Sequence, residues 1–365
     1  MAEFSDAHRR LAHLITSGAY VAGRLPSERA LGESLGISRT TVRKVLAQLE
    51  QDGVLARSST RRAQIARSLD GTGSMRRIAF IAPAFTSAGT GHWEDGLRRA
   101  LAAHPGAHLS SLRYRSGDDL VFAEAARGYD GVFVLMGAEG ADERVREALI
   151  GPGLAPVVSL EQDLSRWGVP SLRLFPPTCV HRVLDEMHAL GHRRIGCLNT
   201  QPEDSIIAAD LQAWQVWMAA RGCRGPLLSE PIAPFGDPMP KAHVLMGRAL
   251  ADHPEVTAWL CLTLEAVRGA IRAVHDAGMV AGREVSLCSI DGQGQEDYLV
   301  PSLACIATVD PTPYLAIGLD WMLAGQRRPW PGALHFTPVE NRFHPGESLG
   351  PVRAPATADR DLVQV

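Results

Sequence analysis

The first 55 residues carry apolar positions at a helical period. Four of them lie at positions i, i+3, i+4 and i+7 and predict one buried helical stripe: Val42, Val45, Leu46 and Leu49. The helix with this stripe is predicted to start after Ser38, a good capping residue, and to reach about Asp52. A shorter helix is predicted from Ser27 to about Leu35, with Gly36 in the turn because glycine accepts the positive φ at which helices end. Two helices joined by so short a turn are typical of a helix-turn-helix.

Two further segments complete this part of the chain. Residues 7–20 are predicted to form a first helix with three apolar residues on one face: Leu11, Leu14 and Ile15. That face would pack against the helix-turn-helix. Residues 68–75 are rich in Gly, Ser and Thr, which predicts a flexible linker. We therefore place a small helical domain over residues 1–67.

The helix after Ser38 has a polar face in its first two turns. Four residues lie off the apolar stripe, where a recognition helix makes its contacts: Arg39, Thr40, Arg43 and Lys44. Arginine presents a rigid fork to guanine or phosphate, threonine bonds phosphate or touches a thymine methyl, and free N–H groups at the helix start attract phosphate. A basic helix alone could be a solvated surface. The complete pattern favours DNA binding.

Several short segments occur in a fixed order over residues 25–53. They are Leu25-Pro26-Ser27-Glu28-Arg29, Leu35-Gly36, Ser38-Arg39-Thr40-Thr41-Val42-Arg43, and Leu49-Glu50 with Gly53. This pattern closely resembles the winged-helix DNA-binding domain of the GntR family of bacterial transcription regulators. The resemblance implies DNA contacts from five residues: Arg29, Arg39, Thr40, Thr41 and Arg43. We add Ser38 and Lys44 because they share the exposed start of the same helix.

Family members usually continue with a β-hairpin wing that has a Gly-x-Gly tip. The matching stretch here is Arg57–Ile65, which lacks these glycines and has extra arginines. Arg61 and Arg62 are candidates to bind phosphate in place of the minor-groove contact of the usual tip.

The charge of the chain is unevenly distributed. The net charge of −3 alone argues against a nucleic-acid-binding protein. Residues 1–69, however, hold eleven basic and six acidic residues, a net charge of +5, which leaves −8 for the rest of the chain. A basic N-terminal part on an acidic body confines the DNA-attracting field to that part.

A different pattern starts at Arg76, where short apolar runs alternate with amphipathic stretches. The predicted strands are 77–82, 108–114, 131–136 and 156–160, and the predicted helices are 92–103, 118–127 and 141–149. After residue 170 the alternation repeats, with strands 171–174, 194–198, 257–262 and 284–290 and helices 177–190, 205–221 and 264–277. Such alternation predicts an α/β fold with parallel sheets covered by helices on both faces. Two consecutive units suggest two lobes with a ligand cleft between them, at the carboxyl ends of the strands.

Further short segments are spread over residues 76–350. They are Val169-Pro170-Ser171, Leu190-Gly191-His192-Arg193-Arg194-Ile195-Gly196, Thr257-Ala258-Trp259-Leu260, Ala266 to Gly278, Val285-Ser286, Ile290-Asp291 and Gly346-Glu347-Ser348-Leu349. Together they resemble the effector domain of the LacI/GalR family, which has the periplasmic-binding-protein fold. The resemblance implies a two-lobed effector-binding and dimerisation domain over 76–350, followed by a tail of residues 351–365.

This chain departs from that family at positions which usually bind sugar. Phe175-Pro176 replaces Asp-Asn, Asp210 replaces an Arg that grips sugar hydroxyls, and Thr263-Leu264 replaces Asn-Asp. Asp291 is kept. Because an unpaired buried polar group costs about 1–3 kcal/mol, a sugar site needs several such groups in place. Either the effector differs from a usual sugar or the sensor has lost its ligand.

Seven residues are the candidates for effector binding: Phe85, Trp93, Asp210, Trp214, Thr263, Glu265 and Asp291. Phe85 and Trp93 could stack on a ring or simply pack. Trp214 could border the cleft, while its neighbour Trp217 is expected in the core. Asp210 and Glu265 could bind a cationic group or be solvated, and Asp291 could accept from a ligand or cap a helix.

Composition excludes several other classes. At 365 residues, 45% hydrophobic and 21% charged, the chain fits a globular protein of two or three domains. It has no apolar run of 18 residues and no apolar signal segment at its start, so we expect a cytoplasmic protein that spans no membrane. None of the six cysteines forms a C-x-x-C pair and the 13 histidines show no metal-ligand spacing, so neither a metal nor a disulfide framework is expected.

Three functions compete. The first is a homodimeric regulator, more often a repressor by analogy, whose operator binding responds to a small molecule, carbohydrate-like or otherwise, through a shift between lobe arrangements. The second is an enzyme fused to a DNA-binding domain, as in GntR-type proteins with a pyridoxal-phosphate domain. Lys44 and Lys241 are the two lysines: one in the recognition helix and one in a predicted loop, neither suited to a Schiff base, so we expect no enzyme and no cofactor. The third is a regulator whose body is only a dimerisation scaffold.

Overall fold

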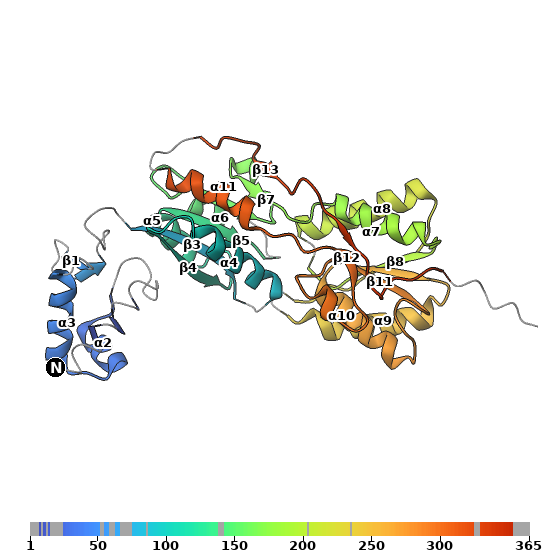
Figure 1. Ribbon diagram of the computed structural model, residues 1–365, viewed down its shortest axis with the longest axis horizontal. Helices are drawn as coiled ribbons and strands as arrows, with labels where there is room; N and C mark the ends of the chain where they lie inside the picture. Colours follow the sequence, from blue (N-terminus) through green and yellow to red (C-terminus); the bar gives the residue numbers. More distant parts are fainter. Residues whose placement is uncertain are drawn as a thin grey trace, which may run out of the picture. The chain divides into compact units, whose positions relative to one another are not determined.

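The computed structural model describes most of the chain (Figure 1). The described residues are 7, 8, 10, 11, 14, 25–51, 55–57, 63–65, 75–84, 87–137, 142–202, 204–233, 236–324 and 329–352. They confirm the predicted mixed α/β class, in which an N-terminal helix-turn-helix is followed along the chain by parallel sheets. The chain divides into two compact units, Met1–Leu172 with Asp310–Phe336 and Arg173–Val309 with Thr337–Val365.

The helix-turn-helix consists of α2 (Glu28–Leu35) and α3 (Arg39–Gln51). The Ser27 hydroxyl caps α2 by accepting from the Ala30 amide, and Gly36 ends the helix with a φ of 71°. Both features follow from local sequence, because a short hydroxyl side chain satisfies a free amide and glycine adopts the left-handed conformation without strain. The two predicted helices are confirmed.

A small apolar cluster holds these helices together. The stripe predicted on α3 supplies buried Val42, Val45 and Leu49, and Leu46 packs beside them. Leu31 and Leu35 of α2 join the cluster, as do Ala7 and Leu11 of the predicted first helix. Ile15 and most of residues 7–20 lie outside the described residues. Strands β1 (Leu55–Arg57) and β2 (Ala63–Ile65) pair antiparallel, so a hairpin follows α3.

The sheet of the first unit has six parallel strands in the order β13-β7-β6-β5-β3-β4. Their bounds are His335–Phe336, Ser171–Leu172, Val157–Leu160, Gly131–Leu135, Arg76–Pro83 and Ala107–Tyr114. Helices α5 (Val121–Gly128) and α6 (Glu143–Leu149) cover one face, burying Phe122, Val145 and Leu149 against Ile81 and Val134. Helices α4 (Ala88–Leu101) and α11 (Thr312–Leu323) pack together on the other face (Figure 1).

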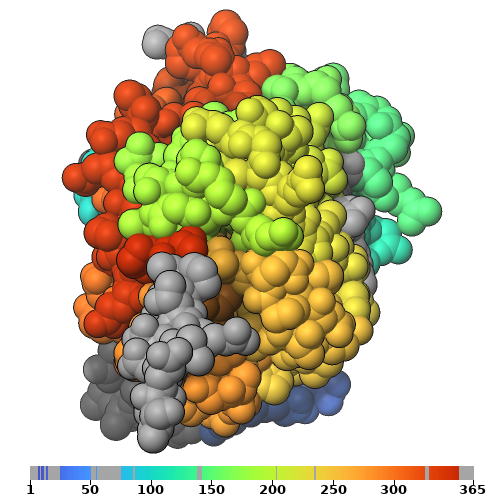
Figure 2. All heavy atoms as spheres, turned by 90° about the vertical axis from the view of Figure 1, so that its right-hand side faces the viewer, coloured from blue at the N-terminus to red at the C-terminus, as the bar shows by residue number. Residues whose placement is uncertain are grey.

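The sheet of the second unit has the order β14-β12-β11-β10-β8-β9 and is parallel except for β14. Its strands are Phe343–His344, Ala304–Ile306, Ser286–Asp291, Ala258–Cys261, Ile195–Asn199 and Leu227–Ser229. Helices α7 (Thr178–Ala189) and α8 (Ser205–Arg221) bury their apolar residues on one face, and α9 (Pro238–Asp252) and α10 (Leu264–Asp276) on the other. Figure 2 looks onto this unit, with α7 and α8 in lime to yellow and α9 in gold.

Helices α9 and α10 lie unusually close. A Cβ atom at Gly269 would meet the Met239 carbonyl oxygen at 2.4 Å, so only glycine permits this approach. Trp259 and Cys261 of β10 are fully buried beneath the pair. The remaining short elements are the 3-10 turns η2 (Ser165–Trp167) and η3 (Glu296–Tyr298).

Two sequence-based assignments are wrong. Lys241 lies in the first turn of α9 and not in a loop, because Asp237 caps the helix and Pro238 and Pro240 occupy early positions that donate no helical hydrogen bond. Ser171–Leu172 belongs to the sheet of the first unit, where it pairs with β6 and β13. The segment predicted as the start of the second lobe is therefore the last central strand of the first.

The predicted core residues and cysteines also have clear places. Trp217 is buried, as predicted, and its indole N–H donates to Asp185 at 3.0 Å. All six cysteines are buried free thiols. Across the part of the chain that is described, no helix is long and apolar enough to cross a bilayer.

Candidate nucleic-acid interface and effector site

The exposed face of α3 carries the predicted DNA contacts. The side chains of Arg39 and Arg43 are 68% and 62% exposed, while Val42 between them is fully buried. Thr40 and Lys44 are exposed on the same helix. The helix thus separates a basic, accessible face from an apolar, buried one, as a recognition helix must.

Glu28 holds the two arginines in place. Its Oε2 accepts from Nε of Arg39 and from Nε of Arg43, each at 2.9 Å. The hydrogen bond from Arg39 lowers the pKa of Glu28, and Arg43 lowers it further. Each bond uses the single N–H on Nε, and it leaves the N–H groups on the terminal guanidinium nitrogens of both arginines for other partners. The Glu28 carboxylate on α2 therefore orients two guanidinium groups on α3. The sequence analysis did not predict this role.

The remaining predicted contacts flank this pair. Arg29 is 81% exposed on α2 and pairs with Glu33, one helical turn away. The Ser38 hydroxyl accepts from the Thr41 amide at 3.1 Å and lies 2.8 Å from the Thr41 hydroxyl, so these two side chains build the N-terminal turn of α3. Arg61 and Arg62 lie outside the described residues.

In the second unit, Asp210 is engaged by an arginine of the chain itself. Arg173 Nη2 donates to Asp210 Oδ1 at 2.8 Å, and both side chains are buried, 8% and 6% exposed. Burial raises the pKa of Asp210 to about 7, and Arg173 opposes this rise. Of the two alternatives for Asp210, the solvated acid is wrong because the side chain is buried, and its cationic partner is an arginine of the chain and not a ligand.

Three other effector candidates lie at one edge of the second sheet. Strands β8, β10 and β11 are parallel neighbours, so their carboxyl ends meet at that edge. Asp291 is the last residue of β11 and is half-buried, and Thr263 follows β10 and caps α10 by accepting from the Ala266 amide. Glu265 sits in the first turn of α10, where burial raises its pKa.

The same edge contains buried polar atoms without partners. Thr200, directly after β8, has an Oγ1 without a hydrogen-bond partner among the described residues, and so has Gln293 Oε1, just after β11. On α8, the buried indole Nε1 of Trp214 also has no hydrogen-bond partner among the described residues. Leaving such a group unsatisfied costs about 1–3 kcal/mol, so a ligand or water that bonds them is favoured. No sequence motif marks Thr200 or Gln293.

The two aromatic candidates of the first unit have different outcomes. Trp93 is buried in α4, with 4% of its surface exposed, which favours the packing alternative. Phe85 lies outside the described residues.

Two segments of the chain match models of known protein families. Residues 5–65 match the model of bacterial regulatory proteins of the gntR family, and residues 184–314 match the periplasmic binding protein-like domain. The chain joins a GntR-family helix-turn-helix domain to a periplasmic-binding-protein-like domain. The match of its N-terminal domain makes it a transcription regulator with a DNA-binding N-terminal domain. No curated protein has a significant sequence match to it.

Solved structures of LacI family regulators share the fold of the body. The regulator from Arthrobacter sp. FB24, in complex with lactose, has 17% identity and a TM-score of 0.63 and covers 76% of this chain and 100% of its own. The regulator from Enterococcus faecium with bound ribose has 18% identity and a TM-score of 0.63, with the same coverage. The regulator CCPA from Weissella paramesenteroides with bound glucose has 16% identity and a TM-score of 0.61, covering 75% and 98%.

Proposed function

We propose that this regulator is a ligand-modulated repressor that binds its operator as a homodimer through α3. The observation that carries this proposal is the pair of exposed guanidinium groups of Arg39 and Arg43, which both donate to Glu28 of α2. The opposite face of their own helix, α3, is buried. Arg29, Thr40 and Lys44 extend the same accessible surface, and Arg61 and Arg62 are proposed to reach phosphates from the wing. The proposal includes the domain bounds: a DNA-binding domain over residues 1–67, a linker over 68–75, an effector-binding and dimerisation domain over 76–350 and a tail over 351–365.

The effector is proposed to bind at the carboxyl edge of the second unit's sheet. Asp291, Thr263 and Glu265 supply acceptors there. Thr200 Oγ1 and Gln293 Oε1, which have no hydrogen-bond partner among the described residues, supply further hydrogen-bonding atoms. Trp214 on α8 adds an indole donor. Three of the structural neighbours have bound lactose, ribose and glucose, which supports a small polar molecule, carbohydrate or similar, for this chain. That Phe85 and Trp93 stack on a bound ring stays a prediction.

Selection of binding sites from a random duplex library tests DNA recognition. We expect the full-length protein to enrich two inverted half-sites, because a two-fold dimer presents two copies of α3 one helical turn or a multiple apart. The variant Arg39→Ala/Arg43→Ala, carried through the same rounds, should enrich no sequence. Enrichment of a single, non-repeated site would contradict the dimer, and enrichment of none by the wild type would contradict operator recognition.

A thermal-shift screen tests the effector site. Sugars, sugar acids, polyols, nucleosides and amines are tried on the full-length protein, and a true ligand should stabilise the folded state by about 2.7 kcal/mol at one hundred times its Kd. Asp291→Asn should shrink this shift. Asp252→Asn, the same change on the exposed end of α9, should leave it unchanged. If no compound in a broad library raises Tm, the result favours the alternative of a dimerisation scaffold without a sensor function.

A further inference from the structure

A groove opens at the amino edge of the first unit's sheet. It has a volume of about 560 Å³, within the range of about 300–1,000 Å³ that small-molecule sites occupy. Four adjacent strands begin there: Arg76 starts β3, Asp130 precedes β5, Val157 starts β6, and Pro170 precedes β7. All lining residues belong to the first unit.

This groove is separate from the proposed effector site. The effector residues Thr263 and Asp291 belong to the second unit and lie at the carboxyl ends of its strands. The groove lies at the opposite, amino edge of the first unit's own sheet. No residue proposed for DNA or effector binding lines it. A ligand held there would thus be additional to the proposed effector.

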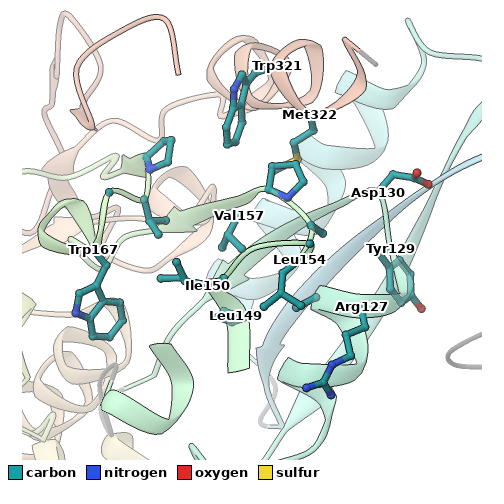
Figure 3. A pocket seen from close by; sticks show the side chains of 18 of the residues that line it. Arg127, Tyr129, Asp130, Leu149, Ile150, Leu154, Val157, Trp167, Trp321 and Met322 are labelled. Atoms are coloured by element: carbon teal, nitrogen blue, oxygen red, sulfur yellow. The ribbon is translucent and has the colours of Figure 1, made fainter. Parts of the chain in front are cut away.

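The groove has an apolar part and a charged end. Figure 3 shows Trp167 at one end, Ile150, Val157 and Leu154 in the middle, and Trp321 with Met322 of α11 along one side. Four of these side chains remain partly exposed: Ile150, Leu154, Trp167 and Trp321. Two indoles and two aliphatic side chains offer a flat or branched apolar body a surface to pack on, and aromatic residues of this kind are frequent anchors of binding sites.

The charged end favours an anion. Figure 3 shows Asp130, Tyr129 and Arg127 along one side, with Tyr129 between the other two. Asp130 is already committed, because its two oxygens accept from Arg76 Nη1 at 3.1 Å and from the Arg77 amide at 2.8 Å. Arg127 is exposed and, within the described part of the chain, makes no ion pair or side-chain hydrogen bond. Because Arg76 balances the charge of Asp130, Arg127 is the net positive charge of this end.

We propose that this groove binds an amphipathic organic acid, with its apolar or aromatic body between Trp167 and Trp321 and its carboxylate at Arg127. A guanidinium matches a carboxylate in geometry and charge, while the partly exposed apolar lining gains from being covered. Arg76 is the first residue of β3 and follows the segment that joins the body to the DNA-binding domain, so the bound acid would contact the start of that strand. The proposal does not depend on the effector site.

Calorimetric titration of the full-length protein with naphthoate tests this site, with naphthamide as the neutral analogue of equal shape. We expect naphthoate to bind with one site per chain and naphthamide to bind more weakly. Arg127→Gln should lower the affinity for naphthoate about fivefold, since an exposed charge pair is removed, and leave naphthamide unchanged. Arg144→Gln, the same change at an exposed position of α6 outside the groove, should affect neither ligand.

Two further variants locate the binding. Trp167→Ala should weaken naphthoate and naphthamide alike, because both use the apolar wall. Asp291→Asn should leave both unchanged, because it lies at the proposed effector site. Absence of naphthoate binding overturns the proposal, as does equal binding to wild type and Arg127→Gln. The proposal is also overturned if Asp291→Asn abolishes binding and Trp167→Ala does not, because the ligand then binds at the proposed effector site.

Discussion

Replacing either Arg39 or Arg43 with alanine should weaken operator binding by about 1–3 kcal/mol, because each arginine is expected to read a base through a bidentate fork. Both side chains are more than three-fifths exposed and are oriented by one carboxylate, so neither substitution should harm folding. Fluorescence anisotropy against the selected operator and its single-base variants measures the effect. Arg98→Ala, which removes an equally exposed arginine from α4, is the matched control.

The operator variants tell which group each arginine binds. If an arginine reads a base, its removal should flatten the preference at one operator position. If it binds a phosphate, its removal should weaken all sequences alike and make the salt dependence shallower by about one unit of slope. Glu28→Ala removes the shared anchor while leaving both arginines, so it should reduce discrimination more than it reduces non-specific affinity. If neither arginine variant changes binding, α3 is not the recognition helix.

How far the sequence predicts this interface depends on the range of the interactions. The bounds of α2 and α3 were predictable because caps and turns act over three or four residues: Ser27 and Gly36 determine where α2 starts and stops. The role of Glu28 was not, because it lies 11 and 15 residues before the arginines that it orients. Only the packing of α2 against α3, through residues such as Leu31 and Val45, brings them together.

The body shows the same division. Helix α8 was predicted with its correct ends because Asp204 caps it and Gly222 stops it. The place of Ser171–Leu172 in the first sheet was missed because pairing with β6 and β13 is a long-range property. Asp210 looked like a free acceptor in the sequence, since its partner Arg173 lies 37 residues away and reaches it only in the folded chain.

That buried pair leads to the largest effect on stability that we expect. Arg173→Met should destabilise the fold by about 3–5 kcal/mol near pH 8, because the buried Asp210 must then either stay ionised without its counter-charge or take up a proton. Arg173 also donates to the Phe175 carbonyl at 2.9 Å, a hydrogen bond that methionine cannot make. Urea denaturation followed by circular dichroism measures the destabilisation. Arg248→Met, which breaks the exposed pair with Glu230 in the same unit, should change little.

The double variant Arg173→Met/Asp210→Leu separates the two causes. If the destabilisation comes from the uncompensated charge, replacing the acid as well should restore most of the stability, since apolar residues of similar size often substitute for a buried ion pair without cost. If the double variant is as unstable as Arg173→Met, packing and the hydrogen bond to Phe175 are responsible, and the charge explanation is wrong.

The dependence on pH gives an independent test with a definite sign. Burial raises the pKa of Asp210 from 3.8 to about 7 in the folded protein, so between these values the folded chain keeps a proton that the unfolded chain has released. The contribution of this group to the free energy of unfolding therefore falls as pH rises from about 4 to about 7 and is constant above. Asp210→Asn should remove that part of the slope, leaving the smaller part from Asp204, whose pKa burial also raises. In Arg173→Met, the free energy of unfolding should continue to fall above pH 7, because no guanidinium then opposes the effect of burial on the Asp210 pKa. If the pH dependence is unchanged in both variants, Asp210 is ionised throughout.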